Sequence, residues 1–445
     1  MKRRLKKRYA FFTAIIALTA VMAVSVHSYI RSGKPVVDES VEAVPPTPLN
    51  HLMENSMSDL AETEKFDAAI RRFMRYWDIK GASFALMKND SLIYAKGYGY
   101  SNIQDSIECE VKNVFRVASV SKLITAVAVM RLCETGKLST QDQVFGEEGI
   151  LCDSLFLNYR DKKIKRITVE HLLRHTGGFA NPHGDAAFNT DLVAKYLGKE
   201  LPLSMDDMVE YATKIRLRAV PGGWFNYSNL GYIILSKVIE TAAGMPYETY
   251  VKDSVLAPMG CYDIHLAHNF SDEFLANEVN YYEVREAEPV PAFNGTDTLV
   301  MKSRGGNDVH GLYGAGGWVA SPVELLKFVS AIDNCPVREE FLSQESIDFM
   351  TLQDNSTKPA GWASVNTREW LRSGSMAGTS ALIKAQKDGY TWVFISNSSS
   401  WTGPALSRQM GRDITRAIQR VKKWPEVDYF SLAPATLPTT SPATI

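Results

Sequence analysis

The chain has 445 residues, of which 45% are apolar and 22% charged, which suffices for one large domain or two small ones. Its formal net charge is −1, but six basic residues precede position 9, so residues 9–445 carry a net charge of −7. A mildly acidic body gives no reason to expect nucleic-acid binding, and we expect no nucleic-acid partner.

Residues 1–30 have the composition of a signal peptide or membrane anchor. The basic residues are followed by residues 9–26, an uncharged and mostly apolar segment close to the roughly 20 residues that span a bilayer. Basic residues on the N-terminal side hold that end in the cytoplasm. We therefore expect a cell-envelope protein with a periplasmic or otherwise extracytoplasmic body, anchored to the membrane through this segment. A cleaved signal peptide is the alternative.

Two further segments lack the periodicity of helices and strands. Residues 31–57 are rich in Pro, Val and Glu, which predicts a linker. Residues 426–445 end in a Pro/Thr/Ala-rich stretch, which predicts a disordered tail. The folded domain is therefore expected over residues 58–425.

This domain has an α+β pattern. Apolar residues at helical spacing predict helices over residues 60–77 and 405–421. Short apolar runs predict four strands, over residues 82–88, 91–96, 381–386 and 391–396. The strands lie near the two ends of the domain, and its middle is helical. We expect one antiparallel sheet built from both ends and flanked by helices, with a helical region inserted between them.

Ser119 and Lys122 stand just before an apolar run from Leu123 to Leu132. The run is apolar on more than one face, so we expect a buried helix and a buried lysine. A spacing of three puts both side chains on one helix face. A desolvated lysine has a lowered pKa and can take the proton of a serine hydroxyl, while N–H groups at the helix start favour an oxyanion. A serine N-cap followed by an ordinary lysine is the alternative.

Tyr227 and Asn229 lie between Pro221-Gly222-Gly223 and a helical run over residues 233–243. A Tyr-x-Asn pair on a turn can aim a phenol and an amide into one cleft. The phenol would shuttle protons, and the amide would donate a hydrogen bond to a substrate carbonyl. An N-cap turn with a packed tyrosine is the alternative.

The third motif, Arg372-Ser373-Gly374-Ser375, precedes the strand predicted over residues 381–386. A strand edge that carries a cation and a small glycine can line a cleft, bind a substrate carboxylate and offer a backbone N–H to an oxyanion. An exposed loop arginine is the alternative.

Taken in this order, Ser119-x-x-Lys122, Tyr227-x-Asn229 and Arg372-Ser373-Gly374 resemble the motifs of the serine β-lactamase-related family. That family contains class C β-lactamases, DD-peptidases, family VIII esterases and related acyltransferases. The resemblance covers roughly residues 66–420. It implies a β-lactamase/transpeptidase-like fold with the catalytic cleft at the seam between the sheet and the inserted helices.

The resemblance also implies a role for each motif residue. Ser119 would form the acyl intermediate, and Lys122 would accept its proton. Tyr227 would exchange protons with Ser119 and the leaving group, and Asn229 would orient the substrate. The oxyanion hole would use the backbone N–H groups of Ser119 and Ser375.

One residue departs from the family pattern. The third motif usually begins with Lys or His, and here it begins with Arg372, two residues before Gly374. Arginine keeps the positive charge but cannot exchange protons near neutral pH, so at this position it can only bind or polarise. The departure argues against a standard β-lactamase.

We therefore expect an exported serine hydrolase that cleaves an ester or amide of a small-molecule or peptide-like acyl substrate through an acyl-Ser119 intermediate. The alternatives are an acyltransferase with an alcohol or amine acceptor, a β-lactamase or DD-carboxypeptidase, and a non-catalytic binding protein of this fold. No cofactor or metal is expected, because the five cysteines lack metal-ligand spacing and no His-Glu-x-x-His motif is present. His175 is expected to be structural.

Overall fold

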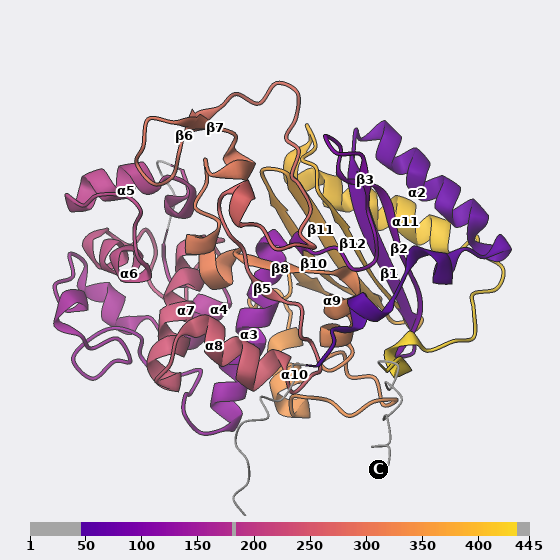
Figure 1. The fold of residues 1–445 in the computed structure, drawn as a ribbon. Helices are drawn as coiled ribbons and strands as arrows, with labels where there is room; N and C mark the ends of the chain where they lie inside the picture. The colour runs from indigo at the N-terminus through magenta and orange to yellow at the C-terminus, as the bar shows by residue number, and fades with distance from the viewer. Residues whose placement is uncertain (1–45, 180–183, 434–445) are drawn as a thin grey trace, which may run out of the picture. The chain divides into compact units, whose positions relative to one another are not determined.

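The computed structural model describes residues 46–179 and 184–433. The segment expected to be a signal or anchor, residues 1–30, lies outside this part of the chain. The centre of the described fold is an antiparallel sheet of seven strands in the order β3-β2-β1-β12-β11-β10-β9 (Figure 1). The strands are β1 (Gly81–Lys88), β2 (Ser91–Asn102), β3 (Ile107–Glu108), β9 (Ser364–Val365), β10 (Glu369–Met376), β11 (Thr379–Gln386) and β12 (Tyr390–Ser396).

Strands from both ends of the chain meet in the middle of this sheet. β1 pairs with β12, and Ala85 lies opposite Val393 in the register. This confirms the antiparallel sheet predicted from the sequence. The strand predicted over residues 91–96 is longer than expected, because β2 continues to Asn102 through two glycines. A Cβ at Gly97 would lie 2.3 Å from the carbonyl oxygen of Cys109, so the close approach of the next segment requires glycine there.

Helices α2 (Glu64–Tyr76) and α11 (Leu406–Ile418) lie side by side over one face of the sheet (Figure 1). Their apolar faces pack on the sheet; Phe66 and Met410 belong to the same buried cluster as Trp392. Both helices confirm the predictions, although each is shorter than its predicted range. A 3₁₀ turn precedes α2, and α11 ends three residues early.

The other face of the sheet meets α9 and the inserted helical region. The helices here are α3 (Ser121–Glu134), α4 (Val169–Leu173), α5 (Thr190–Leu197), α6 (Met205–Lys214), α7 (Asn229–Ala243), α8 (Tyr247–Val251), α9 (Pro322–Val329) and α10 (Gln344–Thr351). A small sheet joins them, formed by β4 (Phe115–Arg116), β8 (Trp318–Ala320) and β5 (His265–Leu266). A hairpin pairs β6 (Val290–Pro291) with β7 (Leu299–Val300).

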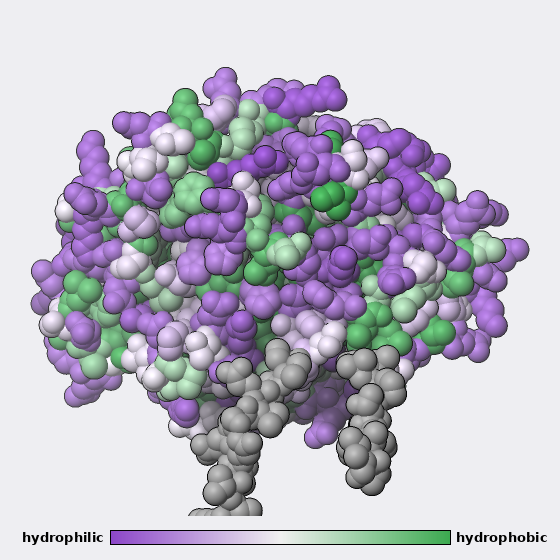
Figure 2. All heavy atoms as spheres, in the orientation of Figure 1, coloured by the Kyte–Doolittle hydropathy of each residue, from purple (hydrophilic) through white to green (hydrophobic). Residues whose placement is uncertain are grey.

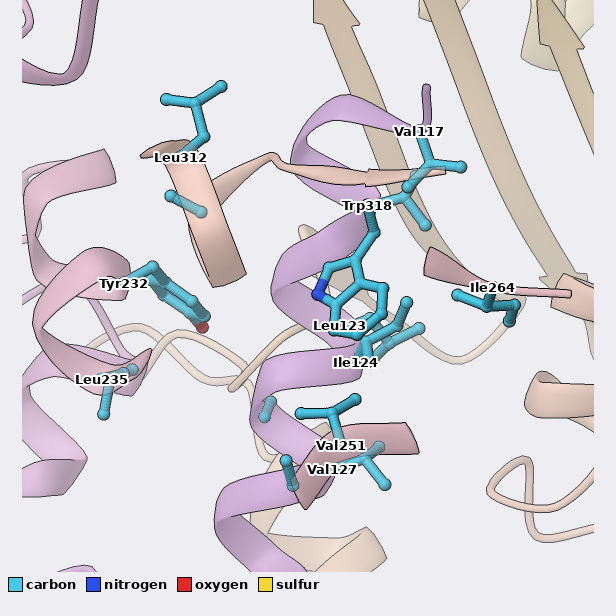
Figure 3. Packing of buried hydrophobic residues seen from close by; sticks show 14 of the residues in the cluster. Val117, Leu123, Ile124, Val127, Tyr232, Leu235, Val251, Ile264, Leu312 and Trp318 are labelled. Carbon is cyan, nitrogen blue, oxygen red and sulfur yellow. The ribbon is translucent and has the colours of Figure 1, made fainter. Parts of the chain in front are cut away.

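Helix α3 is the centre of the larger core. Its side chains are buried on every face, and Figure 3 shows Ile124 and Val127 packed beside Val251 and Trp318. The Trp318 indole donates a hydrogen bond to the Tyr247 hydroxyl at 3.0 Å, so its one polar atom is satisfied. The burial predicted for this helix from its apolar run is confirmed. A helix buried on all sides holds the residues at its N-terminus in a fixed position.

Residues 47–57, predicted as linker, pack on the domain instead. Leu49 and Met53 are buried, and the Asn50 amide donates to the carboxylate of Asp263 at 2.6 Å. At the other end, Asp428 accepts a hydrogen bond from the backbone N–H of Leu92 at 3.0 Å, within the range predicted to be a disordered tail. These segments form short 3₁₀ turns, which leave no periodic signal in a sequence. Residues 434–445 lie outside the described part.

Hydrophilic side chains cover most of the molecular face in Figure 2, and apolar residues occur among them singly or in small groups. Scattered apolar residues of this kind are normal on protein surfaces. Over residues 46–179 and 184–433, no helix has the length and hydropathy needed to cross a bilayer.

Candidate active site

Ser119 lies on a strained turn directly before α3. Residues 118–120 form one turn of 3₁₀ helix, and Ala118 has a φ of +49°, which is unusual for a residue other than glycine. Strand β10 packs closely on this turn. A Cβ at position 374 would lie 2.1 Å from the carbonyl oxygen of Val117, so Gly374 is required for the approach. The turn and the strand together fix the serine.

Lys122 lies one turn further along and is completely buried. Its Nζ lies 3.4 Å from the Ser119 Oγ and donates to the Asn229 Oδ1 at 2.6 Å and to the carbonyl oxygen of Ala315. None of these partners is a carboxylate. Burial lowers the pKa of Lys122 to about 8, helped by the charge of Arg372 and opposed by Tyr227. A lysine with this pKa has a substantial neutral fraction near neutral pH.

Tyr227 reaches Ser119 from the N-terminus of α7. Its hydroxyl donates to the Ser119 Oγ at 2.8 Å. Burial raises the pKa of the Tyr227 phenol, but the charges of Lys122 and Arg372 outweigh this effect and lower the pKa to about 8. The residue as a whole is 37% exposed, so solvent screens part of this effect. The phenol is still the side chain best placed to exchange a proton with the serine.

Asn229 connects Lys122 to a carboxylate that the sequence analysis did not identify. Its Oδ1 accepts from Lys122, and its Nδ2 donates to the Asp185 Oδ2 at 2.7 Å. Both ends of the amide are therefore engaged by protein groups. Asp185 belongs to no recognisable motif, and only the fold brings it to this position.

Arg372 is directed toward Ser119. The residue is 2% exposed, its Nε donates to the carbonyl oxygen of Ser119 at 2.6 Å, and its Nη2 lies 3.4 Å from the Tyr227 hydroxyl. Its charge contributes to the lowered pKa of both Lys122 and Tyr227. The guanidinium is therefore placed to polarise the site, and because it also lines the cavity, both roles that the sequence analysis left open remain predictions.

His175 supports Tyr227 from behind. Its ring lies against the Tyr227 ring with centroids 4.4 Å apart, and its Nδ1 accepts the backbone N–H of Ser228 at 3.2 Å. Burial, aided by the charges of Lys122 and Arg372, holds the pKa of His175 well below its ordinary value. The imidazole is thus neutral and acts as packing, in keeping with the structural role expected for it.

A cavity of about 350 Å³ opens in front of these groups. All of the predicted site residues line it except Lys122, which lies behind the serine. They are Ser119, Tyr227, Asn229, Arg372, Gly374 and Ser375. β9 pairs only with Trp370 and Leu371, so the rest of β10 forms a free sheet edge along the cavity. The structure therefore brings together all three motifs.

The fold and this site define a class: a serine enzyme of hydrolase or acyl-transfer type, in which a lysine and a tyrosine adjoin the nucleophile. A family model described as Beta-lactamase matches residues 66–415. The chain belongs to this family, and the resemblance stated from the sequence is confirmed.

Individual relatives are distant. The putative penicillin-binding protein PbpX of Bacillus subtilis (strain 168) is 24% identical over 406 residues, which cover 88% of this chain and 90% of the relative. The D-amino acid amidase of Ochrobactrum anthropi SV3, solved with D-phenylalanine, superposes with a TM-score of 0.63 at 17% identity and covers 81% and 99% of the two chains. EstCE1, described as a hydrolase with promiscuous acyltransferase activity, has a TM-score of 0.59 at 19% identity and covers 80% and 98%. These structures show the shared fold.

Proposed function

We propose that this enzyme hydrolyses an ester or amide through an acyl intermediate on Ser119. The observation that carries the proposal is the position of the Ser119 Oγ, 2.8 Å from the Tyr227 hydroxyl and 3.4 Å from the Lys122 Nζ, with both groups at a pKa of about 8. A base works best when its pKa lies near the working pH. Because both groups have a pKa of about 8, either can be the acceptor.

The first half-reaction forms the acyl enzyme. The Ser119 Oγ attacks the substrate carbonyl carbon, and its proton passes to the Tyr227 phenolate or, through it, to the Lys122 amine. The carbonyl oxygen becomes an oxyanion, which the backbone N–H groups of Ser119 and Ser375 stabilise. The bond to the leaving alcohol or amine then breaks, and that group takes the proton from Tyr227.

The second half-reaction releases the acyl group. A water molecule attacks the acyl carbon and gives its proton to the same base, and Ser119 recovers the proton as the ester bond breaks. In this scheme Arg372 holds positive charge beside Tyr227 throughout, and Asn229 orients Lys122. The second role is additional to the substrate contact expected from the sequence, because the Asn229 amide also lines the cavity and keeps one N–H free of the bond to Asp185.

Intact-mass measurement tests the proposal. The protein is incubated with p-nitrophenyl esters, β-lactams and acyl-D-Ala peptides. We expect the mass to rise by one acyl group with an ester or peptide and by the whole molecule with a β-lactam, whose leaving amine stays attached after ring opening. The increase should be lost in Ser119→Ala. A wild-type protein that gains no mass with any of these probes, or a Ser119→Ala protein that gains the same mass, would contradict the proposal.

Acyl transfer to an alcohol or amine is the second candidate. It differs only in the acceptor, and a fold neighbour, EstCE1, is described as having promiscuous acyltransferase activity. Partition between water and another acceptor depends on how well the cavity excludes water. Product analysis with one acyl donor and a series of alcohols separates the two functions.

We also propose an extracytoplasmic location, on the sequence of residues 1–30 alone. The basic cluster and the apolar segment after it support export or anchoring. Fractionation of the full-length protein tests this, and recovery in the cytoplasm alone would contradict it.

A further inference from the structure

An unassigned cluster of titratable groups lies at the turn between β1 and β2. Asp90 stands in this turn, and Asp333 and Cys335 stand in the segment that follows α9. One carboxylate oxygen from each acid and the Cys335 Sγ all lie within 4.8 Å of one another. The three residues line a cavity of about 370 Å³ that is separate from the catalytic one.

The Asp90 carboxylate lies against the side chains of Asp333 and Cys335, but no well-formed hydrogen bond from the described residues reaches it. The residue is 1% exposed, and neither of its carboxylate oxygens accepts a hydrogen bond. A buried, unpaired carboxylate is strongly unfavourable unless a proton or a cation neutralises it. Arg338 is close, but its Nε donates to the backbone oxygen of Asp90 and its Nη2 binds Asp428 at 2.6 Å. The Glu340 carboxyl group also lies beside Asp333.

We propose that Asp90, Asp333 and Cys335 bind a divalent cation of the zinc type. Carboxylate oxygens together with a thiolate form a ligand set that Zn²⁺ accepts, whereas Ca²⁺ takes oxygen ligands only. The backbone N–H of Cys335 donates to the Asp333 Oδ1 at 2.9 Å, which would orient that ligand. Binding would release the thiol proton and tie the β1–β2 turn to the segment after α9, so the site would stabilise the fold.

Thermal unfolding of the full-length protein tests the site. After chelation with EDTA, addition of ZnCl₂ well above its dissociation constant should raise the Tm by several degrees, because only the folded state binds the ion. Asp90→Asn and Cys335→Ser should each lose most of this rise. Asp388→Asn is the matched control, because Asp388 lines the same cavity but stands outside the ligand cluster and should leave the rise intact.

Three results would overturn the zinc assignment. The first is a wild-type Tm that ZnCl₂ does not move, as expected if Asp90 and Asp333 share a proton instead. The second is an equal rise in wild type, Asp90→Asn and Cys335→Ser. The third is a response to CaCl₂ that is larger than that to ZnCl₂ and unaffected by Cys335→Ser. If Asp90→Asn fails to fold, the conservative Cys335→Ser variant carries the comparison, together with the zinc content of the purified protein.

A second, independent observation concerns the substrate. A cavity of about 890 Å³ extends from the catalytic one along β10, β11 and α11, and the two share Ala363, Ser373 and Ser407 in their walls. Arg408, Arg412 and Arg416 also line the larger cavity. We call this larger cavity the basic groove, because these three arginines stand in its wall.

The basic groove carries excess positive charge. Arg408, Arg412 and Arg416 are exposed and four residues apart on α11, so they form one stripe. The acid in the groove wall, Glu369, is paired with Lys384 at 2.8 Å. This concentration of positive charge stands on a chain whose residues 9–445 carry a net charge of −7.

We infer, resting on the proposed function, that the acyl substrate is an extended peptide-like chain whose carboxylates lie in the basic groove. Arginine forks match carboxylates well. From Ser407 to Arg416 the helix rises about 14 Å, so a substrate must extend well beyond the scissile bond to reach the whole stripe. The groove would then select substrates by the charge of the part that does not react.

Matched substrates test this inference. Two peptide esters of equal length are compared, one with Glu and one with Gln in the non-reacting part. Wild type should favour the Glu ester at low salt, and the double variant R408E/R412E should reduce that preference about tenfold, mainly through KM. Lys195→Glu is the control. It also replaces a positive by a negative charge, but on the exposed surface of α5.

The outcomes separate the two proposals. Turnover of both esters with no preference in wild type, or an unchanged preference in the double variant, would overturn the role of the groove and leave the proposed function standing. Failure of both esters, together with the absence of any Ser119 adduct, would instead overturn the proposed function.

Discussion

Two buried lysines in this molecule have opposite properties. Lys96, on β2, is 8% exposed and binds the carboxylates of Asp59 and Asp67, the latter at 2.8 Å. Burial lowers the pKa of Lys96, but these two carboxylates outweigh it and raise the pKa above the ordinary value. Lys122 is completely buried, its oxygen partners are an amide, a backbone carbonyl and a hydroxyl, and its pKa falls to about 8.

The comparison shows that burial alone does not make a lysine into a base. What distinguishes the two sites is the formal charge of the oxygens around the amine, since all of them accept hydrogen bonds. The Asp185 carboxylate is connected to Lys122 only through the side chain of Asn229, which bonds to both. The Asn229 amide thus transmits hydrogen bonding without supplying a negative charge to Lys122.

Removing the catalytic lysine should have the largest effect. In Lys122→Met we expect acylation to fall by about 10³-fold or more, because the proton acceptor and the charge that lowers the pKa of Tyr227 are both lost. Burst kinetics with a chromogenic ester measure the change, and the far-UV circular dichroism spectrum should stay that of wild type. Acylation within tenfold of wild type would show that Lys122 is not needed for proton transfer.

The same substitution at the other lysine should act on stability instead. Lys96→Met removes the buried cation of Asp67 and leaves only the half-exposed Arg71 at 3.9 Å, and we expect a loss of about 3 kcal/mol in the free energy of unfolding. Urea denaturation measures it, and acylation per folded molecule should be unchanged. Asp59→Asn is the control, because the Asp59 side chain is 62% exposed and its pairing is worth less than about 1 kcal/mol. Equal losses in the two variants would contradict this account.

Tyr227→Phe removes the hydroxyl nearest to the serine but keeps the ring against His175. We expect acylation to fall by about 10²-fold, within the usual range for loss of one acid–base group. Single-turnover rates measure the loss. A variant that retains full activity would mean that Lys122 acts directly on the Ser119 Oγ across 3.4 Å.

The smallest effect concerns the pH profile. With Lys122 and Tyr227 both at a pKa of about 8, acylation should rise with pH through a midpoint near that value. Arg372→Gln removes a positive charge that lowers both pKa values, so the midpoint should move upward by about one pH unit. Arg372→Lys keeps the charge, so its midpoint should stay close to that of wild type. An unmoved midpoint in Arg372→Gln would contradict the polarising role of the guanidinium.

The sequence predicted the sheet and the motifs well, because both leave local signals. Two hydrophobic hairpins at opposite ends of the domain indicate one sheet, and the apolar run after Lys122 indicates a buried helix. The order of the three motifs then indicates the family, and the family fold implies that the motifs meet in one cleft. The position of Gly374 is also readable, since a small residue is needed wherever a strand approaches a turn closely.

Long-range features could not be predicted in the same way. Asp185 reaches Asn229 across 44 residues, and the inward direction of Arg372 depends on the carbonyl oxygen of Ser119 on another element. Neither contact has a sequence pattern of its own. The same holds for residues 47–57, whose packing depends on single buried side chains such as Leu49, without periodicity.

The pairing of β1 with β12 has a consequence for how the chain is made. The first hairpin emerges from the ribosome long before its partner strand, so an apolar strand edge stays open during most of translation. The nucleophile and the lysine emerge early as well, but the strand that forms the cavity wall emerges late. A nascent or truncated chain should therefore not form this cavity until β10 has been synthesised, so acylation would report that the chain has been made beyond Met376.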